Sequence, residues 1–154
     1  MKRYWPLFCL ILVAAIAAAA LSMSVGRNWM SFFMGFFLCQ FALLKLFNPI
    51  QFADGFQMYD LIAKQSRIYA LAYPLIELAL GLSFLASFQL IAACIVTILI
   101  LGVGAVGVVL ALIRGLDVRC TCMGTILDVP LSTVTLTEDL GMVAMAILLL
   151  VYGH

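Results

Sequence analysis

Five long apolar stretches divide this 154-residue chain, and each is as long as a helix that crosses a membrane. They run over about residues 5–23, 29–47, 68–88, 90–113 and 133–152. A helix of roughly 20 apolar residues spans a hydrocarbon core about 30 Å thick. Because lipid offers the backbone no hydrogen bonds, such segments cross it as helices. The pattern predicts an all-α fold, a polytopic transmembrane helical bundle.

The composition excludes a water-soluble globule. Hydrophobic residues make up 67% of the chain and charged residues 10%, which is too little polar surface to face water. The formal net charge of +1 provides no basic face for nucleic acid, so we expect no such partner. No soluble domain or internal repeat is visible. We therefore expect residues 1–154 to form a single integral membrane domain in contact with the lipid bilayer.

The first apolar stretch has two interpretations. Lys2 and Arg3 resemble the positive start of a signal peptide, and Ala14–Ala20 offers small residues for cleavage. The apolar run of 19 residues is long for a signal peptide. Its length favours an uncleaved membrane helix.

Lysine and arginine residues fall unequally on the two sides of the predicted bundle. With the N-terminus inside, only Arg27 lies outside, and seven lie on the cytoplasmic side: Lys2, Arg3, Lys45, Lys64, Arg67, Arg114 and Arg119. Positive residues in short loops stay on the cytoplasmic side. The bias predicts a multi-pass protein of the cell inner (cytoplasmic) membrane with a cytoplasmic N-terminus.

Cys120 and Cys122 form the pattern that most clearly indicates chemistry. Two thiols one residue apart can cycle between dithiol and disulfide, or hold a soft metal ion between two thiolates. A bridge between them closes almost no loop, so a purely stabilising role would gain little. Arg119 beside Cys120 favours the thiolate electrostatically. A third interpretation is that both cysteines are idle.

The predicted orientation places this cysteine segment at the cytoplasmic face, where thiols are normally kept reduced. Its residues are too apolar for a solvated linker, since they include Leu116, Val118, Met123, Ile126, Leu127, Val129 and Leu131. Non-helical backbone is tolerated at membrane depth where protein covers it. Two possibilities stay open: the pair takes electrons or metal from the cytosol, or the segment dips into the bundle and is reached from both sides.

The segment between the second and third stretches is predicted to form a short helix in the membrane interface. It begins at Pro49, and its apolar residues recur at helical spacing, namely Phe52, Phe56, Tyr59 and Ile62. Such a helix commonly does no more than anchor a protein to the membrane surface.

Glu77 lies near the middle of the third stretch, where an ionisable side chain is costly and usually faces a partner. Lys45 is a candidate ion-pair partner and Tyr59 a candidate hydrogen-bond donor. Alternatively, a neutral Glu77 ties two helices together. Glu138 and Asp139, at the start of the last stretch, either complement a helix N-terminus or exchange protons with the cysteine segment.

Several other signals indicate packing rather than chemistry. Gly102, Gly104 and Gly107 match a dinucleotide-binding pattern, but they lie inside an apolar stretch with no strand before it, so we expect helix packing through these glycines and Ala111. The remaining cysteines, Cys9, Cys39 and Cys94, are expected to be buried apolar fillers. With His154 as the only histidine, an ordinary zinc site is not expected.

The ordered motifs resemble the MauE branch of the DoxX-like redox-associated membrane proteins. They are Lys45-Leu46, then Phe52 and Tyr59, Pro74-Leu-Ile-Glu77-Leu-Ala-Leu-Gly81, Arg114-Gly115 and Cys120-Thr121-Cys122-Met123-Gly124. The resemblance covers about residues 32–152 and implies a four-helix DoxX-like core; the extra N-terminal span that precedes this core is a departure from the family pattern. The best-known members have glycine and phenylalanine where this chain has Thr121 and Met123.

The resemblance implies a redox-associated membrane protein, with maturation of the methylamine dehydrogenase small subunit as the family's named role. We expect a membrane thiol–disulfide oxidoreductase that helps to form disulfides in an exported client. Cys120, Cys122, Arg119 and Glu77 are its candidate catalytic residues, and no cofactor is evident. A thioredoxin-, glutaredoxin- or heavy-metal-associated-domain-like protein is the expected partner. The alternative is a copper protein in which Cys120 and Cys122 bind Cu(I) with help from methionines.

Overall fold

In the computed structural model, which describes residues 5–26, 28–114 and 131–152, nearly every residue is helical. The six helices of these ranges are α1 (Trp5–Val25), α2 (Trp29–Leu46), α3 (Pro49–Tyr59), α4 (Arg67–Ala86), α5 (Leu90–Ile113) and α6 (Leu131–Tyr152). Each of the five apolar stretches corresponds to one helix, with ends that differ by at most three residues. The prediction of an all-α bundle is confirmed.

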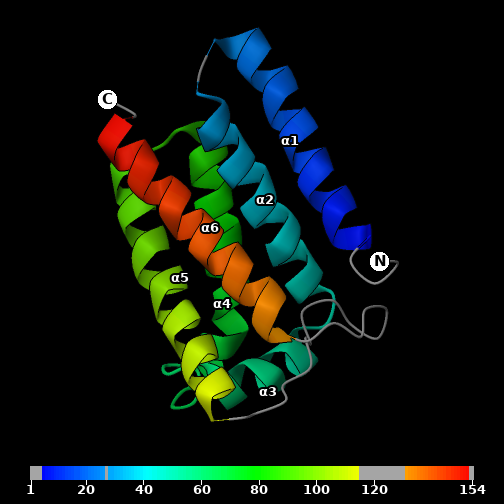
Figure 1. Ribbon diagram of the computed structural model, residues 1–154, viewed down its shortest axis with the longest axis vertical. Helices are drawn as coiled ribbons and strands as arrows, with labels where there is room; N and C mark the ends of the chain where they lie inside the picture. Colours follow the sequence, from blue (N-terminus) through cyan, green and yellow to red (C-terminus); the bar gives the residue numbers. More distant parts are fainter. Residues whose placement is uncertain (1–4, 27, 115–130, 153–154) are drawn as a thin grey trace.

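Length and composition make α1, α2, α4 and α5 able to cross a membrane. The sixth helix, α6, has 22 residues and lies beside α5 (Figure 1). Neighbouring long helices run in opposite directions (Figure 1). Helices α2, α4, α5 and α6 form the core of the bundle, and α3 lies across one end of it (Figure 1).

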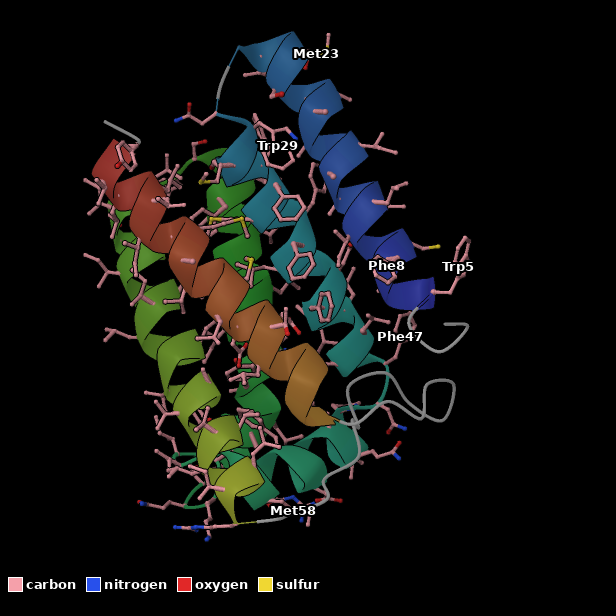
Figure 2. All side chains as sticks on the ribbon, viewed as in Figure 1. Trp5, Phe8, Met23, Trp29, Phe47 and Met58 are labelled. Carbon is pink, nitrogen blue, oxygen red and sulfur yellow. The ribbon has the colours of Figure 1, made fainter. Side chains whose placement is uncertain are left out.

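Helix α1 packs along α2 at the edge of the bundle (Figure 1). Its apolar side chains mostly face outward, including Trp5, Phe8 and Met23, which Figure 2 shows on the outer surface. An apolar helix that is exposed along most of its length fits a lipid-facing span. The arrangement matches the expected four-helix core with one additional N-terminal span.

Helices α2 and α4 approach each other most closely at two glycines. A Cβ atom at Gly81 would lie 2.6 Å from Cys39 Sγ and 2.9 Å from the carbonyl oxygen of Gly35. A Cβ atom at Gly35 would in turn lie 2.9 Å from the carbonyl oxygen of Gly81. Membrane helices pack closely where small residues meet, because lipid provides no hydrophobic force between them. The glycine of the Pro-x-x-Glu-x-x-x-Gly motif is therefore a packing residue.

The tight connection expected between α4 and α5 is present. Ser87 and Gln89 take left-handed backbone conformations with φ of 51° and 46°. The N–H of Phe88 donates to the carbonyl oxygen of Ser83 at 3.0 Å, which satisfies an end carbonyl of α4. This short turn makes α4 and α5 antiparallel neighbours.

Helix α3 packs more deeply than an interfacial anchor would. Phe52 and Phe56 are buried, and the ring centroids of Phe56 and Tyr73 are 4.5 Å apart. Ile50 and Met58 stay exposed on the other side. The expectation of anchoring alone is wrong, because one face of α3 closes the end of the helix bundle.

Candidate functional site

Of the four candidate catalytic residues, Glu77 lies in the described part of the chain, on α4. Cys120, Cys122 and Arg119 lie outside the described residues, so their roles stay predictions. The expectation that the cysteine segment dips into the bundle falls outside them as well. The structure therefore defines the polar surroundings of Glu77.

Glu77 and Lys45 form an ion pair inside the bundle. The Lys45 Nζ atom donates to Glu77 Oε1 at 2.6 Å and to Oε2 at 2.7 Å. The two side chains are only 6% and 1% exposed. The contact of Lys45 Nζ with both carboxylate oxygens is the geometry of an ion pair. It does not match the alternative, in which a neutral Glu77 side chain hydrogen-bonds two helices together. Tyr59, the other candidate partner, has a side chain outside the described residues.

The burial of Lys45 corrects the charge count used for orientation. Lys45 lies in the last turn of α2 and is one of the seven positive residues that give the predicted bias. Because its charge is neutralised within the bundle, it adds nothing to a positive membrane surface. Six lysine and arginine residues against one then remain, and the predicted bias keeps its direction.

The glycine contact explains how the ion pair forms. Glu77 and Gly81 are one helical turn apart and share a face of α4. Because Gly81 lets the two backbones come close, Glu77 comes within reach of the long Lys45 side chain from α2. The Pro-x-x-Glu-x-x-x-Gly motif thus places Glu77 one turn from Gly81, the glycine whose close helix contact brings Glu77 near Lys45.

Aromatic rings cover the lysine. The Lys45 Nζ atom lies 5.1 Å from the centroid of the Tyr73 ring and 5.6 Å from that of Phe52. A cation over a ring face is attracted by the quadrupole of the ring, more strongly where water is absent. The aromatic residues of α3 and α4 therefore stabilise the ammonium and keep solvent from the ion pair.

Asp139 on α6 is a second buried carboxylate in the same region. It is 4% exposed, and Lys45, Glu77 and Asp60 are close enough to act on it electrostatically. A Cβ atom at Gly104 would lie 3.3 Å from Asp139 Oδ2, so this glycine of α5 leaves room for the carboxylate. Asp139 is the ninth residue of α6, beyond the first turn where the helix dipole acts. The interpretation of Asp139 as a helix N-terminal residue is therefore wrong.

Asp60 is a third buried acid, and sequence reasoning missed it. Its Oδ1 atom accepts hydrogen bonds from the backbone N–H groups of Ile62 and Ala63 at 2.9 and 2.8 Å. Its Oδ2 atom has no hydrogen-bond partner among the described residues. An aspartate at the end of a helix that precedes a turn commonly accepts such local bonds, and this was the available signal.

The predictions for the glycine run and the other cysteines hold in part. Gly104, Gly107 and Ala111 lie on the buried face of α5 as expected, whereas a Cβ atom at Gly102 would meet open space.

The cysteines outside the Cys-x-Cys pair are all free: Cys94 is buried, Cys39 is partly buried and Cys9 is exposed. The filler role is thus wrong for Cys9. Within the described residues, no three His, Cys, Asp or Glu side chains gather as they would around a metal ion.

The apolar helices and the buried ion pair together define a multi-pass membrane protein. The family model described as methylamine utilisation protein MauE matches residues 23–152, and the chain belongs to that family. Helix α1 lies almost wholly before the matched region, in agreement with an added N-terminal span. No curated protein and no solved structure matches the chain.

Proposed function

We propose that this protein is a thiol–disulfide oxidoreductase of the cell inner membrane that helps an exported client to form disulfides. The observation that carries the proposal is the Cys120-x-Cys122 pair within the region matched by the MauE family. The family description names methylamine utilisation, and maturation of methylamine dehydrogenase is the role that the resemblance implies, so the proposed client is a protein of that process.

The exchange would proceed through a mixed disulfide. A thiolate of the client attacks Cys120 of the Cys120–Cys122 disulfide, and Cys122 leaves as a thiolate that takes up a proton. The second client thiolate then attacks the client sulfur of the mixed disulfide and expels Cys120. The client leaves with a disulfide, and the membrane protein keeps two thiols. Arg119 favours Cys120 as a thiolate, both as attacking and as leaving group.

Glu77 and Lys45 would act as positioning residues in this scheme. The pair joins α2 to α4, and Asp139 extends the charged region to α6, which follows the cysteine segment in the sequence. A buried network of this kind favours one arrangement of helices over others. A thioredoxin-, glutaredoxin- or heavy-metal-associated-domain-like protein would be the soluble partner of the cysteine pair.

Replacement of the two thiols tests the proposal. Cys120→Ser and Cys122→Ser should each abolish client oxidation while membrane insertion is unchanged, because one thiol cannot close an intramolecular disulfide. Incubated with the client in its disulfide form, Cys122→Ser should trap the client as a mixed disulfide on Cys120, because the Cys120 thiolate attacks the client disulfide and no Cys122 thiol is present to displace the client; alkylation and non-reducing electrophoresis would detect the product. Cys94→Ala is the matched control and should keep full activity. Wild-type activity in the double Cys120/Cys122→Ser protein would refute the proposal.

The copper alternative makes a different prediction. If Cys120 and Cys122 bind Cu(I), the purified wild-type protein should contain copper in a fixed ratio, and the double Cys120/Cys122→Ser protein should contain none. Metal analysis of the two proteins separates this alternative from thiol exchange, which requires no bound metal.

We propose that the N-terminus and the cysteine segment face the cytoplasm. The support is the excess of positive residues at one end of the bundle, including the exposed Lys64 and Arg67. Reporter fusions after residues 60 and 120 should give cytoplasmic readouts, and fusions after 26 and 88 periplasmic ones. A periplasmic readout at 120 with a cytoplasmic one at 88 would overturn the orientation.

A further inference from the structure

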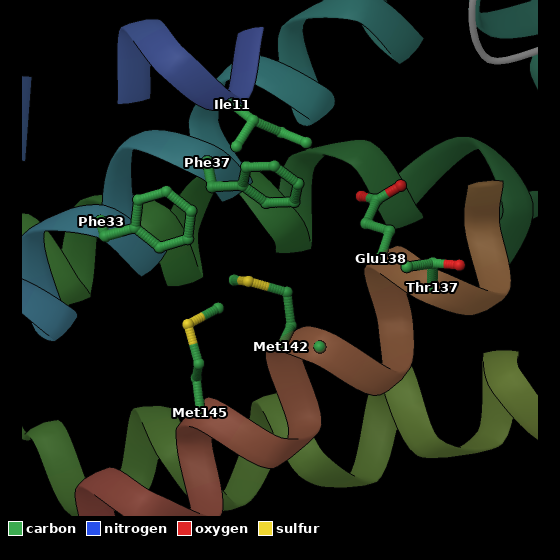
Figure 3. Close-up of a pocket in the computed structure, with 8 residues that line it drawn as sticks. Ile11, Phe33, Phe37, Thr137, Glu138, Met142 and Met145 are labelled. Atoms are coloured by element: carbon green, nitrogen blue, oxygen red, sulfur yellow. The ribbon is translucent and has the colours of Figure 1, made fainter. Parts of the chain in front are cut away.

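A cavity of about 180 Å³ lies between α1, α2 and α6, away from the ion pair. Figure 3 shows the Phe33 and Phe37 rings on one side, the Met142 and Met145 side chains on the other, and Glu138 at one end. Helices α1 and α6 both pack on α2 and leave this space between them. The cavity therefore lies among the long apolar helices of the bundle.

The size and lining of the cavity fit one aromatic ring. An apolar cavity of about 150 Å³ in a protein core holds a molecule the size of benzene. Here the walls are two phenylalanine rings and two thioethers, which contact aromatic ligands favourably. A polar or charged small molecule would lose its water here without gaining partners on most sides.

The one acidic group makes the two ends of the cavity different. Glu138 is partly buried, and its carboxyl group lies beside the apolar walls (Figure 3). A carboxyl group can exchange a proton and a hydrogen bond with an oxygen at the edge of a ring. The apolar walls and the Glu138 carboxyl group together favour a ring that is apolar on its faces and bears an oxygen at one edge.

The proposed thiol chemistry needs a ligand of this class. After each client is oxidised, the two thiols must lose two electrons and two protons before the next turnover. The cavity lies among the long apolar helices, which favours an acceptor that diffuses within the bilayer. A quinone is a lipid-soluble acceptor of two electrons and two protons, and it reaches such a cavity from the bilayer.

We propose that this cavity binds the ring of a membrane quinone, which reoxidises the cysteine pair. The inference rests on the proposed thiol–disulfide function. Two S–H bonds break and one S–S bond forms, while both quinone carbonyl oxygens become hydroxyls of the hydroquinone. Glu138 hydrogen-bonds one of these oxygens and passes it a proton. The isoprenoid tail leaves between α1 and α6 into lipid.

Gly141 allows a clean test of the site. It lines the cavity, and a Cβ atom there would have no neighbour within 4 Å, so a larger side chain enters empty space. Gly141→Leu should fill the cavity without disturbing the helices. Gly102→Leu on α5 is the matched control, because Gly102 also has open space around it but is not among the lining residues.

Trp29 provides the readout. Its ring stacks on Phe33 with 5.1 Å between centroids, so a quinone in the cavity should quench its fluorescence. With Trp5→Phe as background, Trp29 is the only tryptophan of the chain. The purified full chain would be titrated in lipid nanodiscs with decylubiquinone and, separately, with menadione, so that benzoquinone and naphthoquinone ligands are distinguished.

We expect saturable quenching by one of the two quinones. Gly141→Leu should weaken binding by about tenfold or more, Gly141→Ala should weaken it less, and Gly102→Leu should stay within about twofold of wild type. Linear quenching without saturation, or equal affinity in Gly141→Leu and wild type, would overturn the quinone site.

The double Cys120/Cys122→Ser protein separates failure of this inference from failure of the proposed function. It should bind quinone normally but show no quinone-dependent thiol oxidation. Quinone binding in a wild-type protein whose thiols never exchange would keep the site and refute the proposed function. Thiol exchange with a client, without quinone binding, would keep the proposed function and refute the quinone site.

Discussion

The Lys45–Glu77 ion pair allows the most quantitative prediction. In Glu77→Leu the Lys45 ammonium loses the carboxylate whose two oxygens it contacts, and in Lys45→Met the Glu77 carboxylate stays buried without its cation. Removing one partner of a buried ion pair typically costs about 3–5 kcal/mol. On insertion scales, a charged residue at the centre of a membrane helix costs about 2.5–3.5 kcal/mol. We expect each single variant to lose about 3 kcal/mol of unfolding free energy.

The double variant Lys45→Met/Glu77→Leu should behave differently. Replacing both partners of a buried pair by apolar residues of similar size is often neutral or stabilising. We expect its unfolding free energy to lie within about 1 kcal/mol of wild type, so the coupling energy between the two positions should be about 5 kcal/mol or more. Glu77→Gln, which keeps one acceptor oxygen for Lys45, should fall between Glu77→Leu and wild type.

Unfolding by SDS in mixed detergent micelles, followed by circular dichroism, would measure these differences. Lys64→Met is the control for the lysine change, because Lys64 is exposed, and it should have almost no effect. A double variant as unstable as the sum of the two single variants would refute the reasoning. It would show that the two charges are stabilised separately rather than by each other.

Three further predictions concern the scaffold and are checked by the same unfolding assay. Gly81→Ala should cost about 2 kcal/mol because its Cβ would collide with the backbone of α2, whereas Gly102→Ala should be neutral or stabilising by up to about 1 kcal/mol. Ser66→Ala should cost about 1 kcal/mol, since Ser66 Oγ accepts a hydrogen bond from the Tyr69 N–H at the start of α4. Arg67→Ala should change stability by less than about 0.5 kcal/mol, because its ion pair with Asp54 is exposed.

The membrane helices could be predicted closely because lipid imposes a simple rule. A span must be apolar over a fixed length, and each of the five stretches meets that rule in the sequence alone. The packing of α3 could not be predicted in the same way. A helix with one apolar face has the same pattern whether that face meets lipid or protein, so the burial of Phe52 and Phe56 appears only in the structure.

The candidate site was predictable only where one residue carries the signal. Glu77 is unusual for its position in an apolar stretch, and the pairing with Lys45 follows because few cations are near it. Asp139 gave no such signal, since an acid near the start of a stretch has ordinary explanations. Its burial depends on Gly104, which belongs to another helix, and no periodicity in α6 reports that contact.

The buried charges of the bundle and the cysteine pair should respond differently to substitution. Lys45 on α2 pairs with Glu77 on α4, and the buried carboxylate of Asp139 on α6 lies near enough to both to interact with them electrostatically. The charged residues of this region thus come from three helices, including the helix that follows the cysteine segment in the sequence. Changes at the ion pair should therefore alter stability and activity together. Changes at the cysteines should abolish activity, because each of the two thiols is needed to close the disulfide.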